Sequence, residues 1–196
     1  MDIKMKQKRE YIVMTAIDLI HENGFYHVST KEIAKRVGIS ESLVFKIFPK
    51  KSDIIKAVLD QFSLYDRDIY KSALDKNEDP VDAILFFFDK YLLYYENYPA
   101  ITAVFQVLDL QKGYSDIDNI TKEIYLNRLE FIKKLVINAQ ESGRMDKTKD
   151  AEIISDILFS ILKGMCAKWR LSDFSFPLQE RTDEAIGILL EALVTR

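Results

Sequence analysis

Residues 30–48 read "TKEIAKRVGISESLVFKIF", and this stretch decides the fold. Apolar residues recur at helical spacing on both sides of one glycine, Gly38. The pattern predicts a helix over about 30–37 and a second, shorter helix over about 41–48. Glycine adopts a positive φ without steric cost, so we expect Gly38 to form a tight corner between the two helices.

Hydroxyl residues and a proline mark the ends of these helices. We expect Ser29 or Thr30 to cap the first helix and Ser40 to cap the second, because such side chains accept hydrogen bonds from free backbone amides. Pro49 follows the second helix directly, which is typical of a helix end. Both helices are therefore expected to be short.

The second helix is expected to have two unlike faces. Its predicted core face consists of Leu43, Val44, Ile47 and Phe48. The opposite half of the helical wheel is polar except for Phe45. A glycine corner followed by a short helix with such a face is typical of a helix-turn-helix, whose second helix enters the DNA major groove. An ordinary corner between two helices is the alternative.

Together with the preceding "AIDLIHENGF", this stretch resembles the DNA-binding domain of the TetR-type transcriptional regulators. The resemblance covers roughly residues 8–60, and beyond them the chain matches the family only in layout. It implies an all-α fold with a helix-turn-helix DNA-binding domain, placed at 1–52, and a helical effector-binding and dimerisation domain, placed at 53–196. The matching positions are Gly24, Phe25, Thr30, Ile33, Ala34, Gly38, Ile39, Ser40, Phe48 and Lys51, with an aromatic residue at 45.

The resemblance also implies which residues would contact DNA. Thr30 and Lys51 lie at two helix starts and would hold phosphates, a role that a hydroxyl and an ammonium group can fill. Most of the others would face base edges or neighbouring phosphates. The full expected set is Thr30, Lys31, Ser40, Glu41, Ser42, Phe45, Lys46 and Lys51.

Two positions of the second helix depart from the family pattern, and a third carries an unusual residue. Position 45 is commonly tyrosine, whereas Phe45 lacks the hydroxyl and would touch a thymine methyl group or a sugar. Packing against the N-terminal arm is the alternative for this ring. Position 47 is often aromatic or histidine, and Ile47 is expected to turn inward. Glu41 is unusual near phosphates, and its useful role would be to accept a hydrogen bond from cytosine N4.

Charge is unevenly distributed along the 196 residues, whose formal net charge is −3. The first 59 residues hold 11 Lys and Arg against 7 Asp and Glu, a balance of +4, so the remainder carries −7. A positive first third favours a polyanion such as double-stranded DNA as the partner of that region.

The rest of the chain is also expected to be helical, because its 6 glycines and 4 prolines are too few for a β-rich fold. We expect about nine helices in all. Outside the helix-turn-helix they are predicted at about 9–25, 51–76, 80–98, 100–111, 119–142, 150–171 and 178–194, with a loop over 112–118.

The helix over 80–98 is strongly apolar and carries four tyrosines on its inner arc. Buried tyrosine hydroxyls require partners, which either a ligand in a cavity or neighbouring protein groups would supply. An aromatic pocket would suit a small apolar or aromatic effector. The residues expected to line it are Tyr91, Tyr94, Tyr95, Phe105, Phe159, Met165 and Trp169.

Gly164 and Gly187 lie inside the apolar patterns of the last two helices. A glycine in mid-helix costs about 1 kcal/mol relative to alanine, so a close approach of helices would explain both. The resemblance implies that these helices pair with their copies in a homodimer. Two recognition helices on a two-fold axis would read a palindromic operator.

Several classes of function find no support in the sequence. Cys166 is the single cysteine and there are two histidines, so we expect no internal disulfide, no metal and no cofactor. No nucleophile–base pair or phosphate loop points to an enzyme. The longest apolar run, 83–88, is far shorter than the roughly 20 residues that span a membrane, and no signal peptide is visible, so we expect a cytoplasmic protein.

The sequence therefore predicts a ligand-responsive DNA-binding regulator, most simply a repressor. Effector binding would favour a dimer conformation whose recognition helices no longer fit the operator, so ligand and DNA would oppose each other. A regulator whose helical domain senses a protein partner instead of a small molecule is the alternative.

Overall fold

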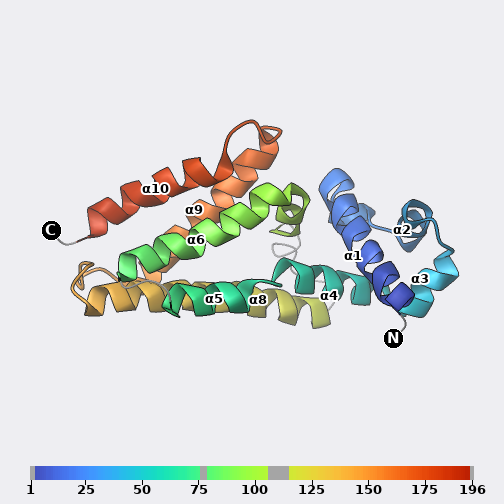
Figure 1. The fold of residues 1–196 in the computed structure, drawn as a ribbon, viewed down its shortest axis with the longest axis horizontal. Coiled ribbons are helices and arrows are strands. Elements are labelled where there is room, and N and C mark those ends of the chain that lie inside the picture. The colour runs from blue at the N-terminus through green and yellow to red at the C-terminus, as the bar shows by residue number, and fades with distance from the viewer. Residues whose placement is uncertain (1–2, 76–78, 106–114, 195–196) are drawn as a thin grey trace. The chain divides into compact units, whose positions relative to one another are not determined.

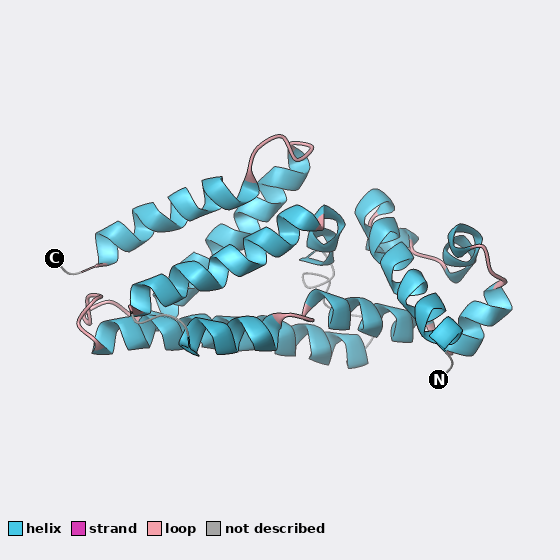
Figure 2. Ribbon diagram, viewed as in Figure 1, coloured by secondary structure: helices cyan, strands magenta, loops and turns pink. Residues whose placement is uncertain are grey.

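The computed structural model describes residues 3–75, 79–105 and 115–194, and their course is shown in Figure 1. Figure 2 shows helices joined by loops, and no strand occurs within the described ranges. One isolated bridge pairs Met145 with Val194. The expected all-α class is confirmed.

The first of two compact units contains the helix-turn-helix, and comprises Met1–Leu64 and Tyr98–Ile124. Its α1 packs against α2, α4 and a short 3-10 helix, η2. Ile12, Ala16 and Ile20 of α1 are fully buried, as their spacing predicts. The helical elements of this unit are α1 (Ile3–Asn23), η1 (Phe25–His27), α2 (Thr30–Val37), α3 (Glu41–Ile47), α4 (Lys51–Phe62) and η2 (Pro99–Ala103).

The second unit comprises Tyr65–Asn97 and Tyr125–Arg196, and α6 is its central helix. α6 packs against both α5 and α10, and α10 packs against α9. The apolar run of α6 explains this position, because Ile84, Phe87 and Phe88 are fully buried. The helices are α5 (Asp66–Asp75), α6 (Pro80–Asn97), α9 (Ala151–Leu171) and α10 (Leu178–Leu193), with α8 (Ser115–Glu141) shared between the units.

The single helix predicted over 51–76 is wrong, because the chain breaks at 63–65 and separates α4 from α5. The Ser63 hydroxyl donates to the Leu59 carbonyl oxygen at 3.0 Å, a side-chain-to-backbone bond that tends to bend helices. After the break, Asp66 opens α5 with its carboxylate directed at an arginine of α8. Asp66 and Arg128 are 62 residues apart in the sequence, so no local sequence pattern predicts the start of α5 at Asp66.

The helix predicted over 100–111 begins instead as the 3-10 helix η2. The Thr102 hydroxyl donates to the Pro99 carbonyl oxygen at 2.7 Å, and Pro99 occupies the first turn. This tight hydrogen-bonded turn accounts for the difference at the start of the segment. Positions 106–111 of the predicted helix lie outside the described residues.

The loop predicted over 112–118 is helical from Ser115, where α8 begins. Asp118 falls in the first turn of α8, where an acidic side chain interacts favourably with the helix dipole. The helix therefore starts four residues before the predicted 119. Positions 112–114 lie outside the described residues.

The connection between α9 and α10 contains two non-glycine residues at positive φ, Asp173 at 52° and Phe174 at 59°. This conformation costs free energy for residues with a side chain. Trp169 holds the connection, because its indole N–H donates to the Phe176 carbonyl oxygen at 2.8 Å. The Phe174 ring also meets the indole edge-on, with centroids 4.7 Å apart.

Candidate functional site

The helix-turn-helix has the side-chain caps that its sequence predicts. The Ser29 side chain accepts a hydrogen bond from the Glu32 amide at 3.1 Å, so Ser29 and not Thr30 is the N-cap of α2. The Ser40 side chain accepts from the Leu43 amide at 3.2 Å and caps α3. Both helix starts are therefore fixed by serine side chains.

Gly38 forms the corner between α2 and α3, as predicted. Its backbone is left-handed, with φ 72° and ψ 35°, a conformation that glycine adopts most readily. The amide of the next residue, Ile39, donates to the Ala34 carbonyl oxygen at 3.0 Å. The direction in which α3 leaves the corner is therefore set by backbone geometry.

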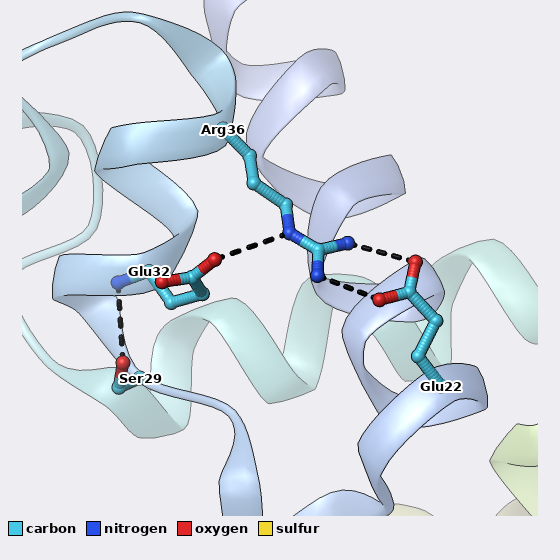
Figure 3. Close-up of polar contacts among 4 residues, drawn as sticks. All are labelled: Glu22, Ser29, Glu32 and Arg36. Carbon is cyan, nitrogen blue, oxygen red and sulfur yellow. Dashed lines mark hydrogen bonds and ion pairs between the residues drawn. The ribbon is translucent and has the colours of Figure 1, made fainter.

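Arg36 fastens α2 to the end of α1 (Figure 3). Its two terminal nitrogens donate to the two carboxylate oxygens of Glu22, at 2.8 Å and 2.6 Å. Its Nε donates to Glu32 Oε1 at 3.4 Å. The hydrogen bonds from Arg36 lower the pKa of Glu22 below its usual value. This paired geometry restrains α2 against α1 at the surface of the unit.

α3 has the expected buried and exposed faces. Val44 is fully buried and Phe48, directly after the helix, is 1% exposed, whereas Phe45 is 43% exposed. Leu43 and Ile47 are only half-buried, so the core face is narrower than predicted. An exposed aromatic ring on a short, capped helix is available for contact with another molecule.

α1 begins at Ile3, so Lys4, Lys6 and Lys8 lie on a helix and not on an extended arm. The next basic residue, Arg9, has its guanidinium carbon 4.2 Å from the centroid of the Phe48 ring. This cation–π contact attaches α1 to the buried aromatic residue at the end of α3.

Two hydrogen bonds join predicted DNA-binding residues to each other. The Thr30 hydroxyl donates to Glu41 Oε1 at 2.6 Å, which links the first residues of α2 and α3. The Ser40 and Ser42 hydroxyls lie 2.9 Å apart. A threonine hydroxyl has one proton, so Thr30 cannot donate to Glu41 and to a phosphate at the same time.

The structure places all eight predicted DNA-binding residues in the helix-turn-helix or at the start of α4, each at least partly exposed. Lys31 and Lys46 are exposed, and Lys51 is half-buried as the first residue of α4. The start of α4 is ordered by the Lys50 amide, which donates to Asp53 Oδ2 at 3.0 Å.

The second unit contains a buried ion pair that the sequence analysis missed. The side chain of Arg128 on α8 is 1% exposed, and that of Asp66 on α5 is 15% exposed. Arg128 Nε and Nη2 donate to Asp66 Oδ2 and Oδ1 at 3.0 Å and 2.8 Å. Buried charges require such paired hydrogen bonds to offset the loss of water.

Two of the predicted effector residues satisfy their hydroxyls at this ion pair. Tyr91 donates to Asp66 Oδ1 at 2.6 Å, and Tyr95 accepts from Arg128 Nη1 at 3.2 Å. Burial raises the pKa of both Tyr91 and Tyr95, so both hydroxyls stay protonated at neutral pH. Asp66 and Arg128 therefore supply hydrogen-bond partners for these two tyrosines.

Tyr70 of α5 completes the group. Its ring stacks on Phe131 of α8, with centroids 4.2 Å apart and planes 6° apart. Its hydroxyl oxygen is buried and has no hydrogen-bond partner among the described residues. Burial raises the pKa of Tyr70, and the negative charge of Asp66 raises it further. The positive charge of Arg128 acts in the opposite direction and lowers this pKa. We call Asp66, Tyr70, Tyr91, Tyr95 and Arg128 the Arg128 cluster.

A groove of about 430 Å³ lies between α5 and α6. Tyr65 and Tyr94 line it with their rings edge to face, 5.0 Å between centroids. At Phe86 the Lys90 ammonium lies 5.0 Å from the ring centroid and 2.8 Å from Asp89 Oδ2. We call this the α5–α6 groove; Asp68 and Ile69 also line it.

The other predicted effector residues do not gather at the groove. Phe105 lies in the first unit, where its ring is 5.2 Å from that of Phe62. Phe159 and Met165 are on α9, respectively buried and half-buried, and Trp169 holds the α9–α10 connection. Of the seven residues, Tyr94 lines the groove, and Tyr91 and Tyr95 belong to the Arg128 cluster.

α9 and α10 carry exposed apolar residues in the single chain. Ile153 and Ile157 of α9 are 58% and 42% exposed, and Ile188 of α10 is 66% exposed. Apart from the backbone of its own helix, a Cβ atom built on Gly164 or Gly187 would meet no atom of the described residues within 4 Å. Close approach within this chain therefore does not explain either glycine.

The missed residue Arg128 does carry a sequence signal. It recurs at helical spacing with the buried residues Ile124, Phe131 and Leu135, so a charge falls on an apolar face. Asp66 carries no such signal, because the sequence predicts it inside a continuous helix. The Arg36–Glu22 pair also joins two helices through residues whose contact is not local.

Neither a membrane-spanning helix nor a cluster of metal ligands occurs in the described part of the chain. None of its helices combines the length and the apolar character needed to cross a membrane. Within the same residues, no three or more His, Cys, Asp or Glu side chains are grouped so that they could hold a metal ion.

Comparison with known proteins finds relatives of both units. A family model described as "Bacterial regulatory proteins, tetR family" matches residues 12–58, and one described as "YsiA-like protein, C-terminal region" matches residues 64–192. The fatty acid metabolism regulator protein of Bacillus subtilis (strain 168) is 21% identical over 197 residues. This alignment covers 96% of the present chain and 98% of the relative.

Solved structures share the fold. The fatty acid degradation regulator FadR from Bacillus halodurans superposes with a TM-score of 0.80 at 17% identity, covering 93% of this chain and 94% of its own. SmeT of Stenotrophomonas maltophilia, in complex with triclosan, gives a TM-score of 0.76 at 16% identity, covering 96% and 92%. These similarities extend over both units.

Proposed function

Because the chain belongs to the tetR family of bacterial regulatory proteins and is a ligand-responsive transcription regulator, we propose that it represses transcription as a homodimer on a palindromic operator. The observation that carries this proposal is α3, a capped helix held by a glycine corner, with a polar face and one exposed phenylalanine. A cytoplasmic location follows from a function at chromosomal promoters.

In this proposal α3 enters the major groove and Lys51 holds a phosphate beside it. Phe45 contacts a thymine methyl group or a sugar, because its ring is exposed and has no hydroxyl for a phosphate. Lys31, Ser42 and Lys46 complete the contacts to bases and neighbouring phosphates. Ser40 supports them as the cap of α3.

Glu41 reads a base amino group, preferably cytosine N4, since a carboxylate only accepts hydrogen bonds. The Thr30 hydroxyl bonded to Oε1 leaves Oε2 available for that contact. If the bond persists on DNA, Thr30 orients Glu41; if it opens, Thr30 binds a phosphate. The two alternatives differ in their effect on sequence preference.

Dimerisation occurs through α9 and α10, whose exposed isoleucines need a cover. Gly164 and Gly187 have free space around them in the single chain, which would admit a closely packed partner helix. A two-fold axis then presents two α3 helices to successive major grooves, so the operator is palindromic. An effector that favours another dimer geometry releases the DNA.

The effector is a small molecule with an apolar or aromatic body, and the second unit binds it. Relatives support a lipophilic compound, since one is a regulator of fatty acid metabolism and another binds triclosan. In this chain the α5–α6 groove has aromatic walls and a volume in the range of ligand pockets.

The test is capture of sheared genomic DNA on the purified protein at near-physiological salt, followed by sequencing. A palindrome enriched at one or a few promoters is expected, whereas binding that only fades with salt would contradict the proposal. On the enriched site, Lys51→Ala should weaken binding to all sequences and lower the salt slope. Glu41→Gln should move the preference at one base pair from cytosine towards adenine.

Phe45→Ala and Phe48→Ala form a matched pair for α3. Phe45→Ala should weaken operator binding with little change in stability, because its ring is exposed. Phe48→Ala should destabilise the unit by about 3–5 kcal/mol, because its ring is buried. Operator affinity unchanged in Phe45→Ala would remove Phe45 from the interface.

A further inference from the structure

The Arg128 cluster is rich in hydrogen-bond donors. Arginine offers five N–H donors and no acceptor, and the three tyrosines add one donor each. Asp66 is the single carboxylate among the five residues, and the Tyr70 hydroxyl is buried without a hydrogen-bond partner in the part of the chain that the structure describes. A buried donor without an acceptor costs free energy, so a carboxylate that also reached the Tyr70 hydroxyl would satisfy the cluster better than Asp66 does.

The α5–α6 groove borders the cluster along both helices. Tyr65, Ile69 and Tyr94 line the groove, and each is followed or preceded in sequence by a member of the cluster. Tyr65 precedes Asp66, Ile69 precedes Tyr70, and Tyr94 precedes Tyr95. Neighbouring residues of a helix point about 100° apart, so the groove and the cluster occupy adjacent faces of α5 and α6.

From this juxtaposition we propose that the effector is an acidic amphiphile, whose aromatic or other apolar body occupies the α5–α6 groove and whose carboxylate replaces Asp66 on Arg128. This refines the effector class and rests on the proposed function. The incoming carboxylate reproduces the paired geometry that Arg128 already makes with Asp66, and it accepts a hydrogen bond from Tyr70.

Charges around the groove are mixed. Lys90 lies near Phe86 and is paired with Asp89, while Asp68 also lines the groove. Asp68 would repel an acid that stayed in the groove. We therefore place the ligand's carboxylate at Arg128. The Arg128 side chain is 1% exposed, so any group that replaces Asp66 there must also be an anion.

The replacement also gives the ligand a means of regulation. Asp66 lies in the first turn of α5, which directly follows α4 and the break at 63–65 in the chain. Its side chain is 15% exposed, so it can turn towards water when the ligand takes its place. The ligand thereby alters the segment of chain that joins the two units.

The experiment compares three probes with the same body: 2-naphthoate, 2-naphthalenemethanol and 2-naphthylmethylammonium, titrated into the full-length protein by calorimetry at pH 7. Wild type should bind 2-naphthoate at least ten-fold more tightly than the neutral and cationic probes. Equal binding of the three, stronger binding of the cation, or no binding of 2-naphthoate would overturn the proposal. Binding to genomic DNA is measured on the same preparation. A failure of the effector proposal can therefore be distinguished from a failure of the proposed DNA-binding function.

Tyr70→Phe is the decisive variant. Its hydroxyl has no hydrogen-bond partner among the described residues, so the melting temperature should not fall, whereas affinity for 2-naphthoate should drop about ten-fold. Tyr26→Phe, at an exposed tyrosine of the first unit, is the control and should change neither value. If Tyr70→Phe bound 2-naphthoate as tightly as wild type does, the proposal that the ligand's carboxylate binds at the Arg128 cluster would be wrong.

Asp66→Asn gives an independent readout. It leaves Arg128 without its carboxylate, so the protein should melt at a lower temperature, and 2-naphthoate should raise that temperature more than it does in wild type. If 2-naphthoate stabilises wild type and Asp66→Asn equally, the ligand does not replace Asp66.

Discussion

Two arginines of this protein make the same paired contact with a carboxylate in opposite surroundings. Arg36 joins α2 to Glu22 at the surface, where the two side chains are 34% and 44% exposed. Arg128 joins α8 to Asp66 inside the second unit, where the values are 1% and 15%. Geometry alone therefore does not measure what an ion pair contributes; water determines the cost of separating it.

The difference suits the two regions. In the helix-turn-helix, the corner and caps already set the shape by backbone geometry, and Arg36 adds a restraint that salt screens. In the second unit, Arg128 contacts Asp66 of α5 and both Tyr91 and Tyr95 of α6. Removing Asp66 or Arg128 there leaves a buried polar group without its partner.

The largest effect is expected for Arg128→Met. It should lower the free energy of unfolding by about 3–5 kcal/mol, because Asp66 is left with a largely buried, unpaired charge. Urea denaturation followed by circular dichroism measures this. The double variant Asp66→Leu with Arg128→Met should recover most of the loss, since no buried charge remains. If Arg128→Met lowered the free energy of unfolding by less than about 1 kcal/mol, the buried ion pair of Arg128 would contribute no more than an exposed pair such as that of Arg36.

An intermediate effect is expected at the glycine corner. Gly38→Ala should cost about 1 kcal/mol, because alanine is disfavoured at the left-handed φ of 72° although a Cβ there would meet no other atom within 4 Å. Gly38→Asn is the control and should cost less, since asparagine tolerates this conformation. Equal melting temperatures for Gly38→Ala and wild type would show that the corner is not what fixes α3.

The smallest effect is expected for Glu22→Gln at the exposed pair. The hydrogen bonds from Arg36 lower the pKa of Glu22, so its contribution is present above the unfolded value of about 4.5 and is lost as the pH falls through the lower folded value. Wild type and variant should therefore differ slightly in melting temperature at pH 7 and coincide at strongly acidic pH. A difference that grows below pH 4 would reverse the sign of this linkage.

The sequence predicts the helix-turn-helix well because its determinants are local. Caps, the glycine corner and the alternation of buried Val44 with exposed Phe45 all act within a few residues. The same local rules predict α6, α9 and α10 within about one residue of their observed ends. Local periodicity is sufficient where each helix buries one stripe.

Prediction fails where distant residues determine the structure. The break before Asp66 and the partners of Tyr91 and Tyr95 depend on Arg128, 62 residues further along the chain than Asp66. A helical wheel places Tyr91 and Tyr95 on the inner face of α6, but it does not show that Arg128 lies next to them. The sequence predicts the seven-residue effector pocket from aromatic character alone, which does not distinguish a cavity from an ordinary core.

The Trp169 contact at the end of α9 allows the connection between α9 and α10 to be followed by fluorescence spectroscopy. Trp169 is the sole tryptophan, and its indole N–H is bonded to the Phe176 carbonyl oxygen. Indole emission depends on the polarity around the ring, so the fluorescence of the whole protein reports on one loop. A change in emission wavelength as the protein is diluted would follow the α9–α10 region through subunit dissociation, without any label or engineered fluorophore.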